Sequence, residues 1–197
     1  DANIVNQPER LRNYAGIIEK ENVRLKQQVE RVLQMARLDK EDIGLKKELL
    51  DIHQIVQDSI RNYAMALEER KGTLKSELPA TRCQVEGDKL HLTSVLNNLI
   101  DNAIKYCREI PSITVRTFNR SNGFIIEVCD NGIGISPEHQ RRIFQKFYPV
   151  PTGNVHDVKG FGLGLSYAKT IIEAHGGAIS LQSELGRGCS FQIYIPG

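Results

Sequence analysis

The strongest constraint on this sequence is an apolar seam within its first forty residues. Between Pro8 and Leu38 the only glycine is Gly16, and Glu, Arg, Gln and Lys are abundant, which predicts one long helix beginning near Pro8. The apolar side chains of this helix step by four and three residues, and they are Leu11, Ala15, Ile18, Leu25, Val29, Val32 and Ala36. This spacing is typical of helices that pack in a coiled coil or an antiparallel bundle.

The seam also implies a partner, because a helix with one strongly apolar side is not stable alone in water. Its one polar position, Asn22, is of the kind that fixes register and oligomeric state. Four further residues widen the apolar face: Tyr14, Ile17, Leu33 and Met35. We therefore expect residues 1–40 to be half of a helical bundle. The alternative is a helix docked on the domain that follows it.

Composition narrows the class of protein to which the whole chain can belong. With 197 residues, of which 40% are hydrophobic and 25% charged, the chain is expected to fold around a sizeable core. A net charge of +2 is too small for the broad positive field of a nucleic-acid binder, so no nucleic-acid partner is expected. No apolar run has the length of a membrane span. The four cysteines form no CxxC pair, which favours free thiols in the cytoplasm.

After residues 39–44 the pattern changes to alternating helix and strand signals, which predict a separate α/β domain over residues 41–197. Helices are expected over 52–70, 88–106 and 164–175, and strands over 45–51, 73–78, 82–86, 112–119, 124–130, 178–183 and 189–195. Because several neighbouring strands form hairpins, the sheet should be mixed, with helices on one face.

One helix carries a polar face suited to phosphate chemistry. Asn98, Asn102 and Lys105 lie at i, i+4 and i+7, opposite a stripe of leucines, isoleucine and valine. Carboxamide oxygens are ligands for a hard cation, and a lysine one turn further can meet a phosphate. This pattern fits Mg²⁺ with phosphate. The alternative is an ordinary solvated helix face.

A second polar feature follows an apolar strand. Asp130 stands at the strand end, where Gly132 and Gly134 allow a ligand to approach the backbone. A carboxylate there can accept a hydrogen bond from the exocyclic amine of adenine. Asp-Asn-Gly is also ordinary turn chemistry. Ser136 and Pro137 then begin a short helix, after which Phe144 and Phe147 are expected to anchor in the core.

A third feature is a long glycine- and proline-containing stretch. Residues 148–159 show no periodicity and are interpreted as a lid, and they lead into alternating glycines at Gly160, Gly162 and Gly164. Free amides at the start of the following helix would make an anion site for a di- or triphosphate. The spacing matches neither GxxxxGK[ST] nor GxGxxG. The alternative is a hinge that binds no ligand.

Together these residues resemble the catalytic and ATP-binding domain of sensor histidine kinases, within the GHKL ATPase superfamily. Residues 98–106 resemble the N box, 130–135 the first glycine box, 144–147 the F box, 160–164 the second glycine box and 186–191 the last glycine motif. The upstream helix resembles the second helix of the family's dimerisation bundle. Five motifs in family order make the resemblance specific.

The resemblance implies a two-layer α/β sandwich of the GHKL (Bergerat) type, with a mixed five-stranded sheet, helices on one face and a mobile lid. It implies that ATP and Mg²⁺ bind, with Asn102 on the metal and Asn98 and Asn102 acting in catalysis. The nucleotide site would comprise Asn98, Asn102, Lys105, Tyr106, Asp130, Gly132, Gly134, Ile135, Lys146, Phe147, Gly160, Phe161, Gly162, Leu163, Gly164, Leu165 and Ser190.

The resemblance further implies that the parent protein transfers the γ-phosphoryl of ATP to a histidine and then to a response-regulator aspartate, as a homodimer through its bundle. None of His53, His91, His139, His156 and His175 has the H-box setting of that acceptor. Asp1 would then lie in the interhelical loop. This portion is expected to bind ATP without phosphorylating itself, and to be cytoplasmic, with any inner-membrane anchor in segments outside it.

A second departure concerns Pro149, which stands where many family members have an arginine that contacts the terminal phosphate. Proline cannot make that contact, although Lys146 or Lys159 could replace it. Pro149 therefore favours the main alternative, a nucleotide-sensing module without phosphotransfer. Other GHKL ATPases are disfavoured because the stretch where they carry a catalytic glutamate reads Asn98 and Asp101 here, and because an F box is present. A plain coiled-coil adaptor leaves the glycine motifs unexplained.

Overall fold

Residues 10–29 are helical wherever the structure describes them. The computed structural model describes residues 10–19, 21, 22, 25, 26, 29, 43–107, 109–149 and 162–197. The chain forms two compact units, Asp1–Ile43 and Gly44–Gly197. In the first, Ile18 and Val29 of the seam are 66% and 57% exposed. The seam positions Val32 and Ala36, with Leu33 and Met35, lie outside the described residues. No described helix combines the length and apolarity of a membrane span.

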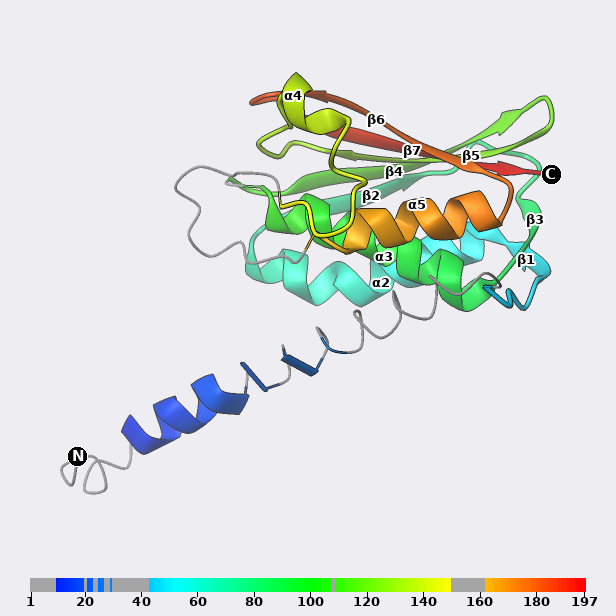
Figure 1. Cartoon of the computed structure of the whole chain (residues 1–197). Coiled ribbons are helices and arrows are strands. Elements are labelled where there is room, and N and C mark those ends of the chain that lie inside the picture. Colours follow the sequence, from blue (N-terminus) through cyan, green and yellow to red (C-terminus); the bar gives the residue numbers. More distant parts are fainter. Residues whose placement is uncertain are drawn as a thin grey trace. The chain divides into compact units, whose positions relative to one another are not determined.

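The second unit is built on a mixed five-stranded sheet, as the sequence predicts. Its strands are β2 (Thr73–Glu77), β4 (Ser112–Arg120), β5 (Gly123–Asp130), β6 (Ala178–Glu184) and β7 (Gly188–Pro196), in the spatial order β2-β4-β5-β7-β6. β2 pairs with β4 in parallel, and the other three pairs are antiparallel. Figure 1 shows the main helices together on one face of this sheet. The expected two-layer architecture is therefore confirmed.

Alternation along the central strands explains why only one face carries helices. Ile113 and Val115 of β4, Ile126 and Val128 of β5 and Ile193 of β7 are all buried. Their neighbours on the other face are polar residues such as Arg116 and Gln192, which are only partly buried. Because successive side chains of a strand point to opposite faces, the apolar set lies against the helices and the polar set faces away.

Two of the expected strands belong to a separate, small sheet. β1 (Glu48–Asp51) pairs antiparallel with β3 (Gln84–Gly87), and neither strand joins the five-stranded sheet. The sequence predicts β1 as an edge strand but does not predict its partner. The pairing is fixed by burial, since Leu50 and Val85 lie opposite each other and are both buried.

Capping residues set the helix starts. Asp51 caps α2 (Ile52–Glu69), Asp88 caps α3 (Lys89–Lys105), and Pro137 begins the short α4 (Pro137–Gln140). Each aspartate accepts a hydrogen bond from a backbone N–H of the first turn. The fourth helix, α5 (Gly164–Ala174), packs against α3 on the same face of the sheet.

A buried histidine joins the far ends of α3 and α5. His175 is 4% exposed; its Nε2 accepts from the backbone N–H of Asp88 at 2.9 Å, and its Nδ1 donates to the carbonyl of Ile171 at 2.7 Å. These two bonds require the neutral ring with its proton on Nδ1. Burial lowers the pKa of His175 below its ordinary value.

This arrangement predicts a specific loss of stability in mild acid. The unfolded chain takes up a proton at His175 as the pH falls through about 6.5, whereas the folded chain does so only at lower pH. The free energy of unfolding should therefore fall in that window and be fully restored above it. Urea denaturation at a series of pH values from about 6.5 downward should measure this effect. The free energy of unfolding should depend less steeply on pH in His175→Gln, because glutamine does not titrate. An unchanged slope in this variant would contradict the assignment.

Candidate functional site

The polar face of α3 is the first component of the candidate site. Leu92, Val95, Leu96, Leu99 and Ile100 are buried as the sequence predicts, and Asn98, Asn102 and Lys105 are half-buried on the other side. No described residue forms a side-chain hydrogen bond with Asn102 in this structure. The ammonium of Lys105 lies 5.3 Å from the centroid of the Tyr106 ring. The helix thus presents a carboxamide and a cation near its C-terminal end.

The start of α5 lies beside this face. A Cβ placed on Gly164 would be 3.5 Å from Oδ1 of Asn98, so the first turn of α5 passes close to that carboxamide. Leu163 occupies the N-cap position and provides no side-chain cap. Its own side chain is buried, and Leu165 is half-buried. The first amides of α5, together with the helix dipole, therefore form a favourable location for an anion.

Asp130 is the charged centre of the third component. It ends β5, and its Oδ1 accepts from the backbone N–H groups of Gly132 at 2.8 Å and Cys189 at 3.2 Å. Burial raises the pKa of the Asp130 carboxyl, and these two hydrogen bonds oppose the rise. Both bonds go to one oxygen. The described residues leave Oδ2 without a hydrogen bond, so it can accept one from a ligand.

The loop after β5 joins Asp130 to the end of α3. The backbone N–H of Ile133 donates to the carbonyl of Tyr106 at 3.1 Å, and a Cβ on Gly132 would lie only 3.0 Å from that oxygen. The N–H of Ile135 donates to Oγ of Ser183 on β6 at 2.8 Å. Asp130 is therefore linked through this loop to the end of the helix that carries Asn98, Asn102 and Tyr106, although it comes from a separate motif.

The β6–β7 hairpin supports that loop through backbone contacts. Gly134 has a φ of +66°, and a Cβ there would lie 2.0 Å from the carbonyl oxygen of Glu184. A Cβ on Gly188 would lie 2.0 Å from the carbonyl oxygen of Asp130. The last glycine motif, expected in the site from sequence, thus acts by letting two backbones meet.

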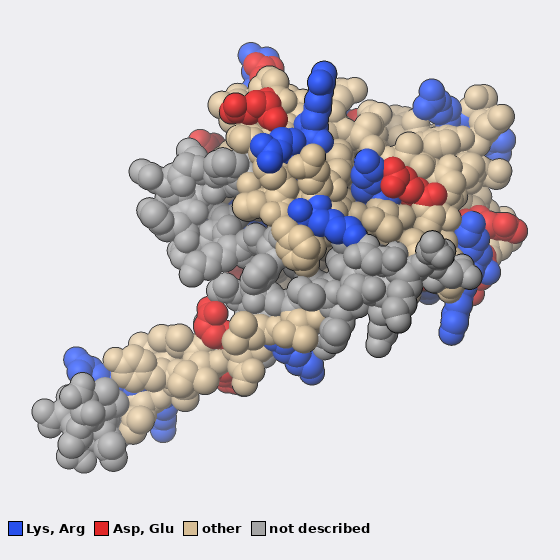
Figure 2. Space-filling view, in the orientation of Figure 1, with Lys and Arg blue, Asp and Glu red and all other residues tan. Residues whose placement is uncertain are grey.

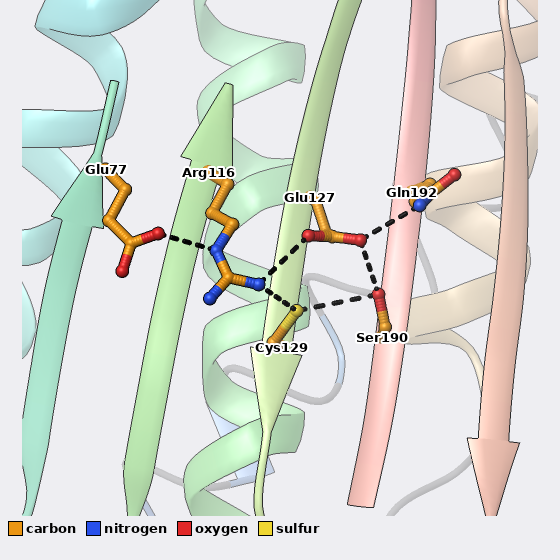
Figure 3. Close-up of polar contacts among 6 residues, drawn as sticks. All are labelled: Glu77, Arg116, Glu127, Cys129, Ser190 and Gln192. Atoms are coloured by element: carbon orange, nitrogen blue, oxygen red, sulfur yellow. Dashed lines mark hydrogen bonds and ion pairs between the residues drawn. The ribbon is translucent and has the colours of Figure 1, made fainter. Parts of the chain in front are cut away.

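Ser190 does not join the other residues expected to bind the nucleotide. Its hydroxyl donates to Oε1 of Glu127 at 2.9 Å, on the face of the sheet that carries no helices (Figure 3). Burial would raise the pKa of Glu127, but hydrogen bonds from Gln192, Ser190 and others lower it overall. Arg116 extends this network to Glu77.

Its neighbour Cys189 is the residue that sequence reasoning missed. The Cys189 N–H meets Asp130, and burial, with the nearby Asp130 charge, raises the pKa of the Cys189 thiol to about 12. The signal was available in the strand pattern, since Cys189 shares a face with the buried Phe191 and Ser190 does not.

The segment after α4 departs from the expectation of two phenylalanine anchors. Ile143 is the buried anchor, and Phe144 packs edge-on against Phe191 with ring centroids 6.5 Å apart. Phe147 has a φ of +58° and is 62% exposed, because the turn carries its side chain outward. Lys146 is also exposed.

The two flanks of the expected lid meet at their backbones. Gly162 has a φ of +67°, and a Cβ there would lie 2.6 Å from the nitrogen of Tyr148. The hydroxyl of Tyr148 is 2.6 Å from Nδ1 of His139, and the Arg142 guanidinium lies over the Tyr148 ring at 4.2 Å. Gly160 and Phe161, with most of the expected lid, lie outside the described residues.

On the face of the molecule seen in Figure 2, basic and acidic side chains are interspersed. The candidate site itself combines a few local groups, namely a carboxylate, carboxamides, a lysine and helix amides. Such a set suits a ligand with a hydrogen-bonding ring at one end and anionic groups at the other.

Comparison with known proteins agrees with this geometry. Residues 87–197 match the family described as histidine kinase-, DNA gyrase B-, and HSP90-like ATPase. The chain belongs to this ATPase family. The sensor protein RprX of Bacteroides fragilis is 42% identical over the whole chain, and the sensor protein SrrB of Staphylococcus aureus is 32% identical over 98% of it. The chain spans 38% of RprX and 33% of SrrB.

Solved structures of the family share the fold. Full-length ShkA in complex with AMPPNP superposes with a TM-score of 0.83 at 25% identity, over 94% of this chain and 38% of ShkA. The histidine kinase AdeS of Acinetobacter baumannii gives 0.73 at 26% identity, over 93% of this chain and 83% of the AdeS chain. The resemblance to sensor histidine kinases inferred from the five motifs is thereby confirmed.

The glycine contacts of this ATPase domain predict that two Gly→Ala substitutions destabilise it to different extents. Gly134→Ala should destabilise the domain by more than about 1–3 kcal/mol, because strain at positive φ is added to a clash with Glu184. Gly186→Ala is the matched control, since Gly186 also has a positive φ of +82° but no atom within 4 Å of a Cβ. Chemical denaturation should rank Gly134→Ala as clearly less stable, and equal losses would refute the proposed backbone contact.

Proposed function

We propose that this chain binds Mg-ATP and is the catalytic portion of a sensor histidine kinase, which transfers the γ-phosphoryl group to a histidine. The observation that carries the proposal is the Asp130 carboxylate, held by two backbone amides with its second oxygen available, beside the end of α3. Membership of an ATPase family and the AMPPNP bound to ShkA support ATP as the ligand.

The base end of the site is argued from Asp130. An ionised carboxylate can accept a hydrogen bond from the exocyclic amine of adenine but not from a carbonyl at the same ring position, so it selects adenine over guanine. A side chain at position 132 would collide with the Asp130 carboxylate and the Tyr106 carbonyl. Glycine at this position therefore keeps the space beside Asp130 open for a ring. Gly134 and Ile135 hold the loop in this position.

The phosphate end is argued from α3 and α5. The carboxamide of Asn102, half-buried and available, fits a magnesium ligand, and Asn98 adjoins the first turn of α5. When bound, Mg²⁺ would neutralise charge on the phosphates. Lys105 and the α5 amides beginning near Gly162, Leu163, Gly164 and Leu165 would orient the phosphate oxygens, and Lys146 and Phe147 would flank them. Phosphoryl transfer depends mostly on such positioning and charge stabilisation.

The proposal for phosphoryl transfer beyond ATP binding is argued from the relatives. RprX and SrrB are named sensor proteins, and this chain matches about a third of each. We propose that residues 1–40 form part of a dimerisation bundle, because their exposed apolar seam needs a partner helix. The phosphoryl group would pass onward to a response-regulator aspartate.

The assignment of Asp130 predicts a substitution that weakens ATP binding without destabilising the fold. Asp130→Asn should weaken ATP binding about 10–100-fold, the equivalent of one hydrogen bond to a charged group. The free energy of unfolding without nucleotide should not fall at neutral pH, because the substitution removes a buried charge that folding disfavours. Calorimetry and urea denaturation measure the two effects. Asp58→Asn on the exposed face of α2 is the control and should leave affinity unchanged.

The kinase assignment predicts phosphotransfer only when an acceptor is supplied. With Mg-ATP alone this chain should gain no stable phosphohistidine, because none of its five histidines has an H-box setting. Adding a family H-box helix in the same polypeptide should yield acid-labile label on that helix, and Asn102→Ala should abolish it. If the wild-type chain binds ATP but the extended protein never gains label, the chain is a nucleotide sensor and the kinase proposal fails.

A further inference from the structure

Three potential metal ligands of different chemistry converge outside the nucleotide site. Asp51, His53 and Cys83 each offer one ligand atom, and these atoms all lie within 4.8 Å of one another. Asp51 is exposed, and His53 and Cys83 are partly exposed, so an ion could reach them from solvent. None of the three belongs to the motifs that form the nucleotide site.

The backbone fixes this convergence. Asp51 ends β1 opposite Gln84 of β3, and the N–H of Ile52 extends the ladder by donating to the carbonyl of Cys83 at 2.9 Å. Ile52 is fully buried and thereby anchors the corner where β1 becomes α2. Asp51 and His53 flank Ile52, so both are held next to Cys83 without depending on a flexible loop.

Asp51 retains a ligand atom after it has capped α2. Its Oδ1 accepts from the backbone N–H groups of His53 at 2.8 Å and Gln54 at 3.3 Å. The capping role occupies one oxygen, and the carboxylate also accepts a hydrogen bond from the Cys83 thiol, which a bound cation would replace. The capping bonds also restrict the rotation of the carboxylate, which lowers the entropy cost of using it as a ligand.

His53 is oriented by a buried partner. Its Nε2 lies 3.0 Å from Oγ1 of Thr117, which is fully buried on β4, and its ring packs 6.0 Å from that of Phe124. Nδ1 is therefore the nitrogen that remains for a metal. Histidine ligands usually use their second nitrogen in this way, to fix the tautomer and the ring orientation.

We propose that Asp51, His53 and Cys83 form a zinc site with water as the fourth ligand. Thiolate, imidazole and carboxylate together suit Zn²⁺ in preference to Mg²⁺ or Ca²⁺, which need oxygen ligands. The two anionic ligands neutralise the divalent ion. Tetrahedral zinc bonds of this kind put ligand atoms roughly 3.3–3.8 Å apart, which side-chain rotation can reach from the observed separation.

The site ties the strand that enters the second unit to the body of that unit. β1 follows Gly44 by a few residues, Cys83 immediately precedes β3, and Thr117 belongs to the central sheet. Binding exchanges the thiol proton of Cys83 for a zinc–sulfur bond and releases that proton to solvent, so affinity falls as pH falls. Bound zinc should stabilise the folded chain according to its free concentration.

The experiment titrates the whole purified chain, without nucleotide, with Co²⁺ and then Zn²⁺. One equivalent of Co²⁺ should produce the intense near-ultraviolet band of a cobalt–thiolate bond and the visible bands of tetrahedral cobalt, and Zn²⁺ should displace both. Cys83→Ser should abolish the thiolate band. Asp51→Asn keeps the helix cap and His53→Gln keeps a polar side chain, and each should weaken binding by about 10–100-fold.

Cys129→Ser is the matched control, because it removes another partly buried thiol on the far side of the sheet and should leave the spectrum unchanged. Zinc should raise the unfolding temperature of the wild type and of Cys129→Ser, but not that of Cys83→Ser. Equal cobalt spectra for wild type and Cys83→Ser, or zinc stabilisation that survives this substitution, would overturn the proposal. Because ATP binding is measured separately, failure here leaves the kinase proposal untouched.

Discussion

Close backbone approach at glycine is the interaction on which the candidate site depends. Gly134 lies against Glu184 and Gly188 lies against Asp130, so the loop after β5 and the β6–β7 hairpin meet without side chains between them. This contact brings the N–H of Cys189 to the Asp130 carboxylate. Two backbone donors then stabilise a partly buried negative charge that burial alone would disfavour.

Helix α3 connects that charge to the rest of the molecule. One side of the helix fills the core with leucine, valine and isoleucine, and the other carries Asn98, Asn102 and Lys105. The carbonyl of its C-cap residue Tyr106 accepts from the loop after β5, while its N-terminus is held by Asp88 and, through Asp88, by His175. Packing and ligand chemistry are therefore set by the same 17-residue element.

Local sequence patterns predicted most of the fold, because most of it is determined locally. Strand alternation, helical spacing and turn residues located the elements to within a few residues, and the leucine stripe of α3 identified its buried side. The partner of β1 was not predictable, because the pairing depends on contact between Leu50 and Val85, 35 positions apart along the chain. The exposed position of Phe147 was missed for a related reason, since a positive φ in a turn overrides the apolar pattern.

The site was predictable as a set of residue types but not in its detailed arrangement. Asn98, Asn102 and Asp130 were predicted from chemistry and spacing, and Ser190 was predicted with them although its hydroxyl bonds to Glu127 on the other face. One residue along the strand reverses the face, so a motif match does not decide which neighbour points inward. The convergence of Asp51, His53 and Cys83 has no signal in the sequence, because antiparallel pairing creates it.

The burial of Cys189 has a consequence for chemical durability. A thiol whose pKa is raised to about 12 stays protonated at neutral pH. Peroxides and electrophiles react with the thiolate, so this sulfur adjoining the Asp130 carboxylate is kept in its inert form. The same desolvated surroundings that hold Asp130 therefore protect the adjacent cysteine from oxidative damage.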